Sequence, residues 1–301
     1  MWFRNLQVYR FPAPWKISAS KLEEQLGRHV FRPASGFEMQ TQGWASPRDD
    51  GGLVHSVHGH MLLSLCTEKK LLPASVIKEA VKVKAIEAEE RQGYKPGRKQ
   101  LRDLKEEVID ELLPRAFSVR RRTGIWISPK EGWLVIDVGS PGKADEIIGL
   151  MNKSIDDFVV ERLNTVEAPG TAMTAWLAGG NVPHGFSIDQ DTELQSPVEE
   201  KATVRFVRHA LDAKEVKRHI DGGKQCTLLA LTWANRVSFV LTEALVMKRV
   251  APVDVIRESE GAQSQNDDER FDADFTLMTG EFQHLLTDLV EALGGRTPGS
   301  P

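Results

Sequence analysis

The sequence contains few cysteines and no long apolar run, and both absences restrict its class. Of its 301 residues only two are cysteines, Cys66 and Cys226, and each lies within an apolar stretch. We therefore expect no disulfide framework, as is usual in the reducing cytosol. No run of about 18 apolar residues occurs, and residues 1–5 contain no apolar signal region, so we expect neither a membrane span nor secretion.

Familiar catalytic motifs are also missing from the sequence. Glycine-rich turns occur at residues 139–144 and 222–224, but neither has the spacing of a Walker phosphate loop or the Ser/Thr that follows it. No Gly-x-Ser-x-Gly nucleophile elbow is present. His55, His58 and His60 flank a glycine turn, where alternating strand positions make side chains diverge, so we expect hairpin histidines in preference to a zinc site.

One acidic cluster keeps an enzymatic alternative open. Asp267 and Asp268 come just before a predicted helix, and Asp272 and Asp274 lie at its start. Their carboxylates could bind Mg²⁺, as in a metal-dependent nuclease. Acidic residues at this position more often complement the positive end of the helix dipole. A protein-interaction scaffold that does not bind DNA is a third alternative.

Positive charge is concentrated in particular stretches, although the net charge of the chain is −4. Residues 91–130 contain 11 Lys/Arg and 5 Asp/Glu, a local net charge of 11 − 5 = +6. Residues 201–224 contain 7 and 3, a net of +4, whereas residues 254–274 contain 2 and 8, a net of −6. The mean charge argues against a nucleic-acid-binding domain. The uneven distribution is nevertheless what a basic binding stripe requires.

The first basic stretch ends in a segment that combines arginines with one phenylalanine. A charged helical run ends at Pro114, and we expect the next strand to begin beyond Thr123. Arginine suits phosphate binding because its planar guanidinium donates two parallel hydrogen bonds. Phe117 has no local core to enter and could anchor a partner subunit. The alternative is a solvated turn with one residue tucked into the domain.

The second basic stretch places cations on a strand and on the helix that follows it. On the predicted strand 203–207, Arg205 shares a face with the first and last residues. Lys214, Lys217 and Arg218 lie on one side of the next helix, which could equally be an ordinary solvated face. The candidate phosphate contacts from both stretches are Arg115, Arg120, Arg121, Arg122, Lys201, Arg205, Arg208, His209, Lys214, Lys217 and Arg218.

The hydrophobic pattern predicts an α+β fold of antiparallel sheets and helices. Two heavily charged helices have only a narrow apolar stripe, so we expect them to project from the body. Strand, helix and then several strands occur in both the first 70 and the last 100 residues, which suggests an internal structural duplication. The expected strands are 3–11, 43–47, 53–57, 60–67, 125–127, 133–136, 203–207, 226–233, 236–241 and 245–250. The expected helices are 20–27, starting with a capping box at Ser20, 73–92, 101–112, 145–154, 212–220 and 271–293; residues 171–177 fit a strand or a helical turn, and 258–269 a loop.

These elements suggest a division of the chain into five parts. We expect an N-terminal α+β part (1–70), projecting helices with the arginine-rich segment (71–123), a central hairpin and helix (124–200), a C-terminal α+β part with a basic finger and final helix (201–295), and a disordered tail (296–301).

Four segments carry a resemblance to a known bacterial family. They are residues 1–6 (MWFRNL), 71–78 (LLPASVIK), 112–118 (LLPRAFS) and 270–281 (RFDADFTLMTGE). With these segments the chain resembles the recombination-associated protein RdgC family over nearly its whole length. The last segment is long and chemically unusual, so chance agreement is a poor explanation for it.

The resemblance implies a cytoplasmic, nucleoid-associated protein without enzymatic activity, cofactor or metal. It implies a ring-shaped homodimer whose positively charged hole encloses double-stranded DNA with little sequence preference and which opposes the recombinase RecA. Binding of single-stranded DNA stays open. Phe117 matches an aromatic residue that plugs the partner subunit. Arg208 and His209 match finger positions where the family more often carries Lys and Gln, and histidine is the weaker cation near neutral pH.

Overall fold

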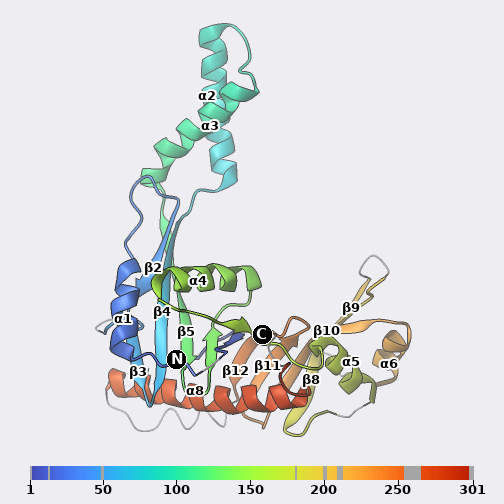
Figure 1. Ribbon diagram of the computed structural model, residues 1–301. Coiled ribbons are helices and arrows are strands. Elements are labelled where there is room, and N and C mark those ends of the chain that lie inside the picture. Colours follow the sequence, from blue (N-terminus) through green and yellow to red (C-terminus); the bar gives the residue numbers. More distant parts are fainter. Residues whose placement is uncertain are drawn as a thin grey trace.

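A computed structural model of the chain (Figure 1) has the predicted α+β class, with two antiparallel sheets. It describes residues 2–12, 14–48, 51–179, 182–198, 202–208, 213–253 and 266–297. Among these residues, no helix combines the length and the apolar character needed to cross a membrane.

The first sheet has the strand order β2-β4-β5-β6-β1-β7, with β3 also paired to β4. Its two long strands, β4 and β5, pair over nearly their whole length. The β3–β4 turn is formed by His58 and Gly59, whose φ values of 51° and 83° are those of a tight hairpin, as the sequence predicts. The strands are β1 (Gln7–Arg10), β2 (Gln40–Ala45), β3 (Val54–Val57), β4 (His60–Lys70), β5 (Ser118–Ser128), β6 (Trp133–Ile136) and β7 (Glu161–Arg162).

The second sheet has the order β12-β11-β10-β8-β9. The predicted meander forms its first three strands, and Ala234 and Asn235 turn between β10 and β11 with φ values of 50° and 54°. Strand β8 was absent from the prediction, although it is the strand that joins β9 to the meander. The strands are β8 (Phe186–Gln195), β9 (Thr203–Phe206), β10 (Gln225–Trp233), β11 (Val237–Thr242) and β12 (Met247–Pro252).

Helices cover both faces of the first sheet. Side chains alternate along β5, so Ile125 and Ile127 pack toward α1 and α4, whereas Trp126 packs toward α8 and the second sheet. Figure 1 shows α8 running beneath both sheets, so one long helix ties them together. The helices of this body are α1 (Ala19–Leu26), α4 (Pro141–Ser154), α5 (Pro169–Gly179), α6 (Ala213–Asp221) and α8 (Asp267–Ala292), with a short 3₁₀ turn η1 (Gly27–His29).

The helix pair α2 (Ala74–Gln92) and α3 (Arg98–Leu112) projects from the end of β4 and β5, as predicted (Figure 1). Helix α2 buries no residue and α3 buries only Val108. Charge links the two helices, because Lys84 donates to Glu107 at 2.7 Å and to Glu111 at 2.5 Å. A pair with so little apolar contact keeps most of its surface available to a partner.

Several predicted boundaries are wrong. The first helix is capped by Ser18, whose hydroxyl accepts from the Lys21 amide, so the capping box at Ser20 was misplaced by two residues. Strand β5 starts at Ser118, well before Thr123, because it pairs with β4 up to Lys70. Of the two alternatives left open for residues 171–177, the structure has the helical one, within α5.

The C-terminal region also departs from the prediction. Residues 254–265 lie outside the described residues, but Asp267, Asp268 and Glu269, expected in a loop, form the first turn of α8 behind the cap Asn266. Arg296 of the predicted disordered tail pairs with Thr165 in a β-bridge. The five-part division of the chain and the internal duplication stay predictions; β5 runs continuously across the boundary placed at residue 123.

Candidate nucleic-acid interface

The three consecutive arginines of the first basic stretch lie in strand β5, where they were expected in a turn. Because strand side chains alternate, Arg121 shares the face of Ile125, whereas Arg120 and Arg122 share the face of Trp126. Arg121 therefore faces the side of α4, and its two neighbours face the opposite side. A single phosphate surface cannot use the whole triplet in the same way.

Arg120 is held by an acidic residue of the neighbouring strand. Glu68 lies directly opposite it in the β4–β5 register, and Arg120 Nε donates to Glu68 Oε2. Glu68 is only 3% exposed, and the hydrogen bond from Arg120 holds the pKa of its carboxyl below the ordinary value. The Arg120 guanidinium also lies 5.6 Å from the centre of the Phe31 ring. The main role of Arg120 is thus to neutralise a buried carboxylate, and only the guanidinium nitrogens that do not contact Glu68 are available to a phosphate.

Arg121 has a different environment. It lines a cleft of about 550 Å³ between α4 and the end of the first sheet nearest the helix pair, together with Lys69 and Lys143. Sequence reasoning missed both lysines, because 52 and 22 residues of chain separate them from Arg121 and only strand pairing and helix packing bring them together.

Arg115 and Phe117 lie where the helix pair joins the sheet. Arg115 ends the 3₁₀ turn η2 (Leu113–Arg115) and is exposed. Phe117 is 86% exposed, while its backbone oxygen accepts from the Leu71 amide at 2.7 Å. Its backbone is fixed and its ring has no cover within the described chain, as expected of a residue that enters a partner.

An apolar groove lies between α2 and α3, the helices that adjoin the segment of Phe117. It has a volume of about 310 Å³ and is lined by Ala74, Ile77, Val81 and Leu101, with the stems of two lysines. Ala74 is three residues from Leu71, which bonds to the backbone of Phe117. The ring and a groove of matching character thus lie at the same end of the molecule.

The second basic stretch is only partly free to bind. Arg205 on β9 lies opposite Glu193 on β8, and its Nε donates to Glu193 Oε2 at 2.8 Å. Burial raises the pKa of Glu193, but the hydrogen bonds from Arg205 and Thr227 lower it by more, so the carboxylate stays charged. Arg205 therefore forms an ion pair within the subunit, at the edge of the sheet.

Arg208 and helix α6 present their cations outward. The Arg208 backbone, at φ 50°, is held by a 2.8 Å hydrogen bond from its amide to Asp191 Oδ1, and its side chain is exposed. Lys214, Lys217 and Arg218 are all exposed on one side of α6, as predicted, while Val216 is buried. Lys201 and His209 lie outside the described residues.

The acidic cluster is engaged in contacts that do not resemble a metal site. Arg48 Nη1 lies 3.6 Å from carboxylate oxygens of both Asp268 and Asp272. His55 Nε2 also lies 2.9 Å from Asp272 Oδ1. Burial lowers the pKa of His55 and outweighs the opposing effect of Asp272. Within the described ranges, no three His, Cys, Asp or Glu side chains are grouped to hold a metal ion.

Two of the three hairpin histidines that were considered as zinc ligands, His55 and His60, contact different residues. His55 packs edge-on against Phe271 of α8, with ring centres 5.2 Å apart. His60 Nδ1 accepts a hydrogen bond from Trp126 Nε1 at 3.3 Å, and burial lowers its pKa, which favours the neutral ring that this bond requires. Both residues are thus occupied by the packing of the first sheet.

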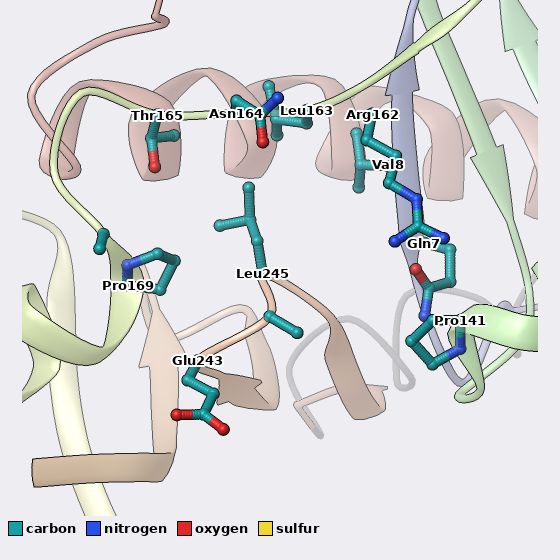
Figure 2. Close-up of a pocket in the computed structure, with 12 residues that line it drawn as sticks. Gln7, Val8, Pro141, Arg162, Leu163, Asn164, Thr165, Pro169, Glu243 and Leu245 are labelled. Carbon is teal, nitrogen blue, oxygen red and sulfur yellow. The ribbon is translucent and has the colours of Figure 1, made fainter. Parts of the chain in front are cut away.

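A pocket of about 360 Å³ lies where the two sheets meet (Figure 2). Figure 2 shows Leu245 in its middle and the Glu243 carboxylate pointing away from Gln7 and Arg162. Its lining contains one carboxylate and no His, Cys or Ser. The groups in this lining that acid–base or nucleophilic catalysis could use are the Glu243 carboxylate and the Thr165 hydroxyl, and Figure 2 shows the carboxylate pointing away from Thr165.

Comparisons with known proteins agree over almost the whole chain. A family model described as "RdgC: Putative exonuclease, RdgC" matches residues 1–296. A protein of Janthinobacterium sp. (strain Marseille), named "Recombination-associated protein RdgC", is 59% identical over 295 residues, covering 98% of each chain. Proteins with the same name from Herminiimonas arsenicoxydans and Burkholderia cenocepacia are 58% and 56% identical, over 98% of this chain and 98% and 96% of theirs.

The environments of neighbouring arginines predict different effects on stability. Arg120→Ala should lower the free energy of unfolding more than Arg121→Ala, because only the first leaves the buried Glu68 carboxylate without its cation. Urea titration of each variant measures the difference. Adding Glu68→Gln to Arg120→Ala should recover part of the loss, and equal losses for the two single variants would contradict the pairing.

Proposed function

We propose a function from the premise that the chain belongs to the RdgC family of recombination-associated proteins. It is a non-catalytic protein that binds double-stranded DNA without sequence specificity. It acts as a ring-shaped homodimer that encircles the duplex, and it modulates recombination by opposing RecA. Its place in the cell is the cytoplasmic nucleoid, where the duplex is.

The observation that carries this proposal is the position of the unpaired cations on an L-shaped subunit. In Figure 1 the first sheet and the helix pair form one arm, and α8 with the second sheet forms the other. Helix α4, which Arg121 faces, lies in the inner angle, and β9 and α6 lie toward the far end of the second arm. Among the described residues, the exposed cations without an ion-pair partner that we assign to the DNA are Arg115, Arg121, Arg208, Lys217 and Arg218.

Two L-shaped subunits enclose a hole if they meet at the ends of both arms. A two-fold axis makes each contact self-complementary, so a residue on one subunit and its receiving surface must lie at the same end. Phe117 and the groove between α2 and α3 meet this requirement at one end. We assign the groove to the Phe117 ring of the second copy.

A lining of arginine and lysine accounts for binding without sequence preference. Each cation that neutralises a phosphate releases condensed counterions, and this gain does not depend on the bases. The net charge of −4 is compatible with it, because the acidic residues concentrate elsewhere in the chain. Opposition to RecA then has a simple physical cause: DNA that lies inside a protein ring is not accessible to a recombinase filament.

A nuclease is the second candidate, because the description of the family model that matches the chain contains the words "Putative exonuclease". Its carboxylates would be Asp267, Asp268, Asp272 and Asp274. Arg48 and His55 now contact Asp272, so a metal ion would have to displace them. Circular and linear DNA incubated with the protein and Mg²⁺ should stay intact; cleavage that Asp272→Ala abolishes and Asp110→Ala preserves would establish the nuclease instead.

DNA binding by the proposed cations should show in its salt dependence. Arg208→Ala and Arg218→Ala should each lower the slope of log Kd against log salt by about one unit, and equally for duplexes of different sequence. Lys130→Ala is the control, because Lys130 is an exposed cation in the β5–β6 turn and is not among the cations assigned to the DNA. Fluorescence anisotropy with a labelled duplex at several salt concentrations measures the slopes, and slopes equal to the control's would remove both residues from the interface.

Loss of the Phe117 ring should weaken the dimer. Burying a phenylalanine contributes about 1.5–3 kcal/mol, and a two-fold contact contains two of them, so Phe117→Ser should raise the dimer dissociation constant at least tenfold. Sedimentation equilibrium measures this constant, with Val166→Ser as a control at another exposed apolar residue. An unchanged constant for Phe117→Ser would show that this end of the subunit is not an interface.

A further inference from the structure

The cleft between α4 and the first sheet gathers cations that the sequence pattern does not connect. Gln42, Thr67 and Arg121 lie side by side across β2, β4 and β5, and Gln40, Lys69 and Val119 form the next row. Lys143, near the start of α4, lines the cleft from the other side. The cleft thus has a floor of strand side chains and a wall formed by a helix.

The charge of this cleft is not neutralised by the protein itself. Three cations line it, Lys69, Arg121 and Lys143, against one acid, Glu146, which gives 3 − 1 = +2. Within the described part of the chain none of the three forms an ion pair, in contrast to Arg120 and Arg205. Lys69 and Arg121 are diagonal neighbours across two strands, where like charges repel unless an anion lies between them.

The other side chains of the cleft indicate which part of a nucleic acid it suits. Gln40, Gln42, Thr67 and Thr123 supply amide and hydroxyl donors, which phosphate and sugar oxygens accept. The lining contains no aromatic side chain, although aromatic rings are what unstacked bases of a single strand require. A cleft of about 550 Å³ is also far too small for a whole duplex.

We propose that this cleft binds the sugar–phosphate backbone of one strand of duplex DNA, with Lys69 and Lys143 as binding residues beside Arg121. The proposal rests on the function proposed above, and it adds two DNA-binding residues and the location of one DNA-binding cleft. The cleft holds one strand by its phosphates while the bases stay paired. The neighbouring residue Lys70 differs from Lys69, because its side chain lies on the other face of β4, outside the cleft. Its Nζ lies 3.4 Å from the Ala116 carbonyl oxygen.

The test compares two double variants of the full chain. Lys69→Ala with Lys143→Ala removes both lysines of the cleft, and Lys70→Ala with Lys153→Ala removes one cation from each of the same elements, β4 and α4, outside its lining. Binding of a 30-base-pair duplex and of a single strand of equal length is measured by anisotropy from low to moderate salt. Lys69→Arg with Lys143→Arg keeps the charge and separates its effect from any change in folding, which circular dichroism monitors.

The cleft variant should lower the salt slope for the duplex by about two units and weaken binding on the order of 50-fold at 0.1 M salt, while the control pair and the Arg pair behave as the wild type. A duplex slope equal to that of the control pair would overturn the proposal, as would a loss confined to the single strand. A wild-type protein that binds no duplex at low salt would instead refute the function on which the proposal rests.

Discussion

The pairing of β4 with β5 is the constraint on which the rest of the structure depends. Ten consecutive residue pairs join the two strands, from Met61 with Ile127 to Lys70 with Ser118. At one end the ladder is buried on both faces, and at the other it leaves the body and carries the helix pair (Figure 1). A shift of one residue would exchange the faces of every side chain, so the buried half fixes where the charged half points.

Helix α8 sets the angle between the two arms. Its apolar side packs against both sheets, and polar contacts bind it to the second one. Arg236 Nε donates to Glu281 Oε2 at 2.7 Å, and Trp233 Nε1 donates to Asp288 Oδ2 at 2.8 Å. The sheets also meet directly, since Leu6 and Met247 exchange backbone hydrogen bonds of 2.8 and 3.2 Å. Arg121 on β5 and Arg208, two residues beyond the end of β9, are therefore held on one rigid body, as a binding surface made of two parts requires.

The sequence predicted what depends on neighbours along the chain. Both tight turns, the helix pair and the cations on one side of α6 follow from local spacing and turn residues. Strand β8 was missed although Ile188, Thr192 and Leu194 alternate with Asp189, Asp191 and Glu193, because Gln190 and the acidic residues leave no continuous apolar run; its pairing with β9 and β10 reveals it.

The candidate site shows the same division between local and long-range information. Its arginines were predicted from the sequence, but their partners and the lysines Lys69 and Lys143 were not. Glu68 lies 52 residues from Arg120, and Lys143 reaches the cleft of Arg121 through the packing of α4. Which arginine is paired and which is free is decided by register, and register depends on the whole sheet.

The central claim is that unpaired cations from two separate parts of each subunit line one enclosed channel. An electron cryo-microscopy map of the protein with a 30-base-pair duplex tests it most directly. The account predicts two subunits closed around one duplex, with Arg121 and Arg208 of each directed at its phosphates. A single subunit bound to the side of the DNA, or a dimer whose α4 and β9 surfaces point away from it, would contradict the account.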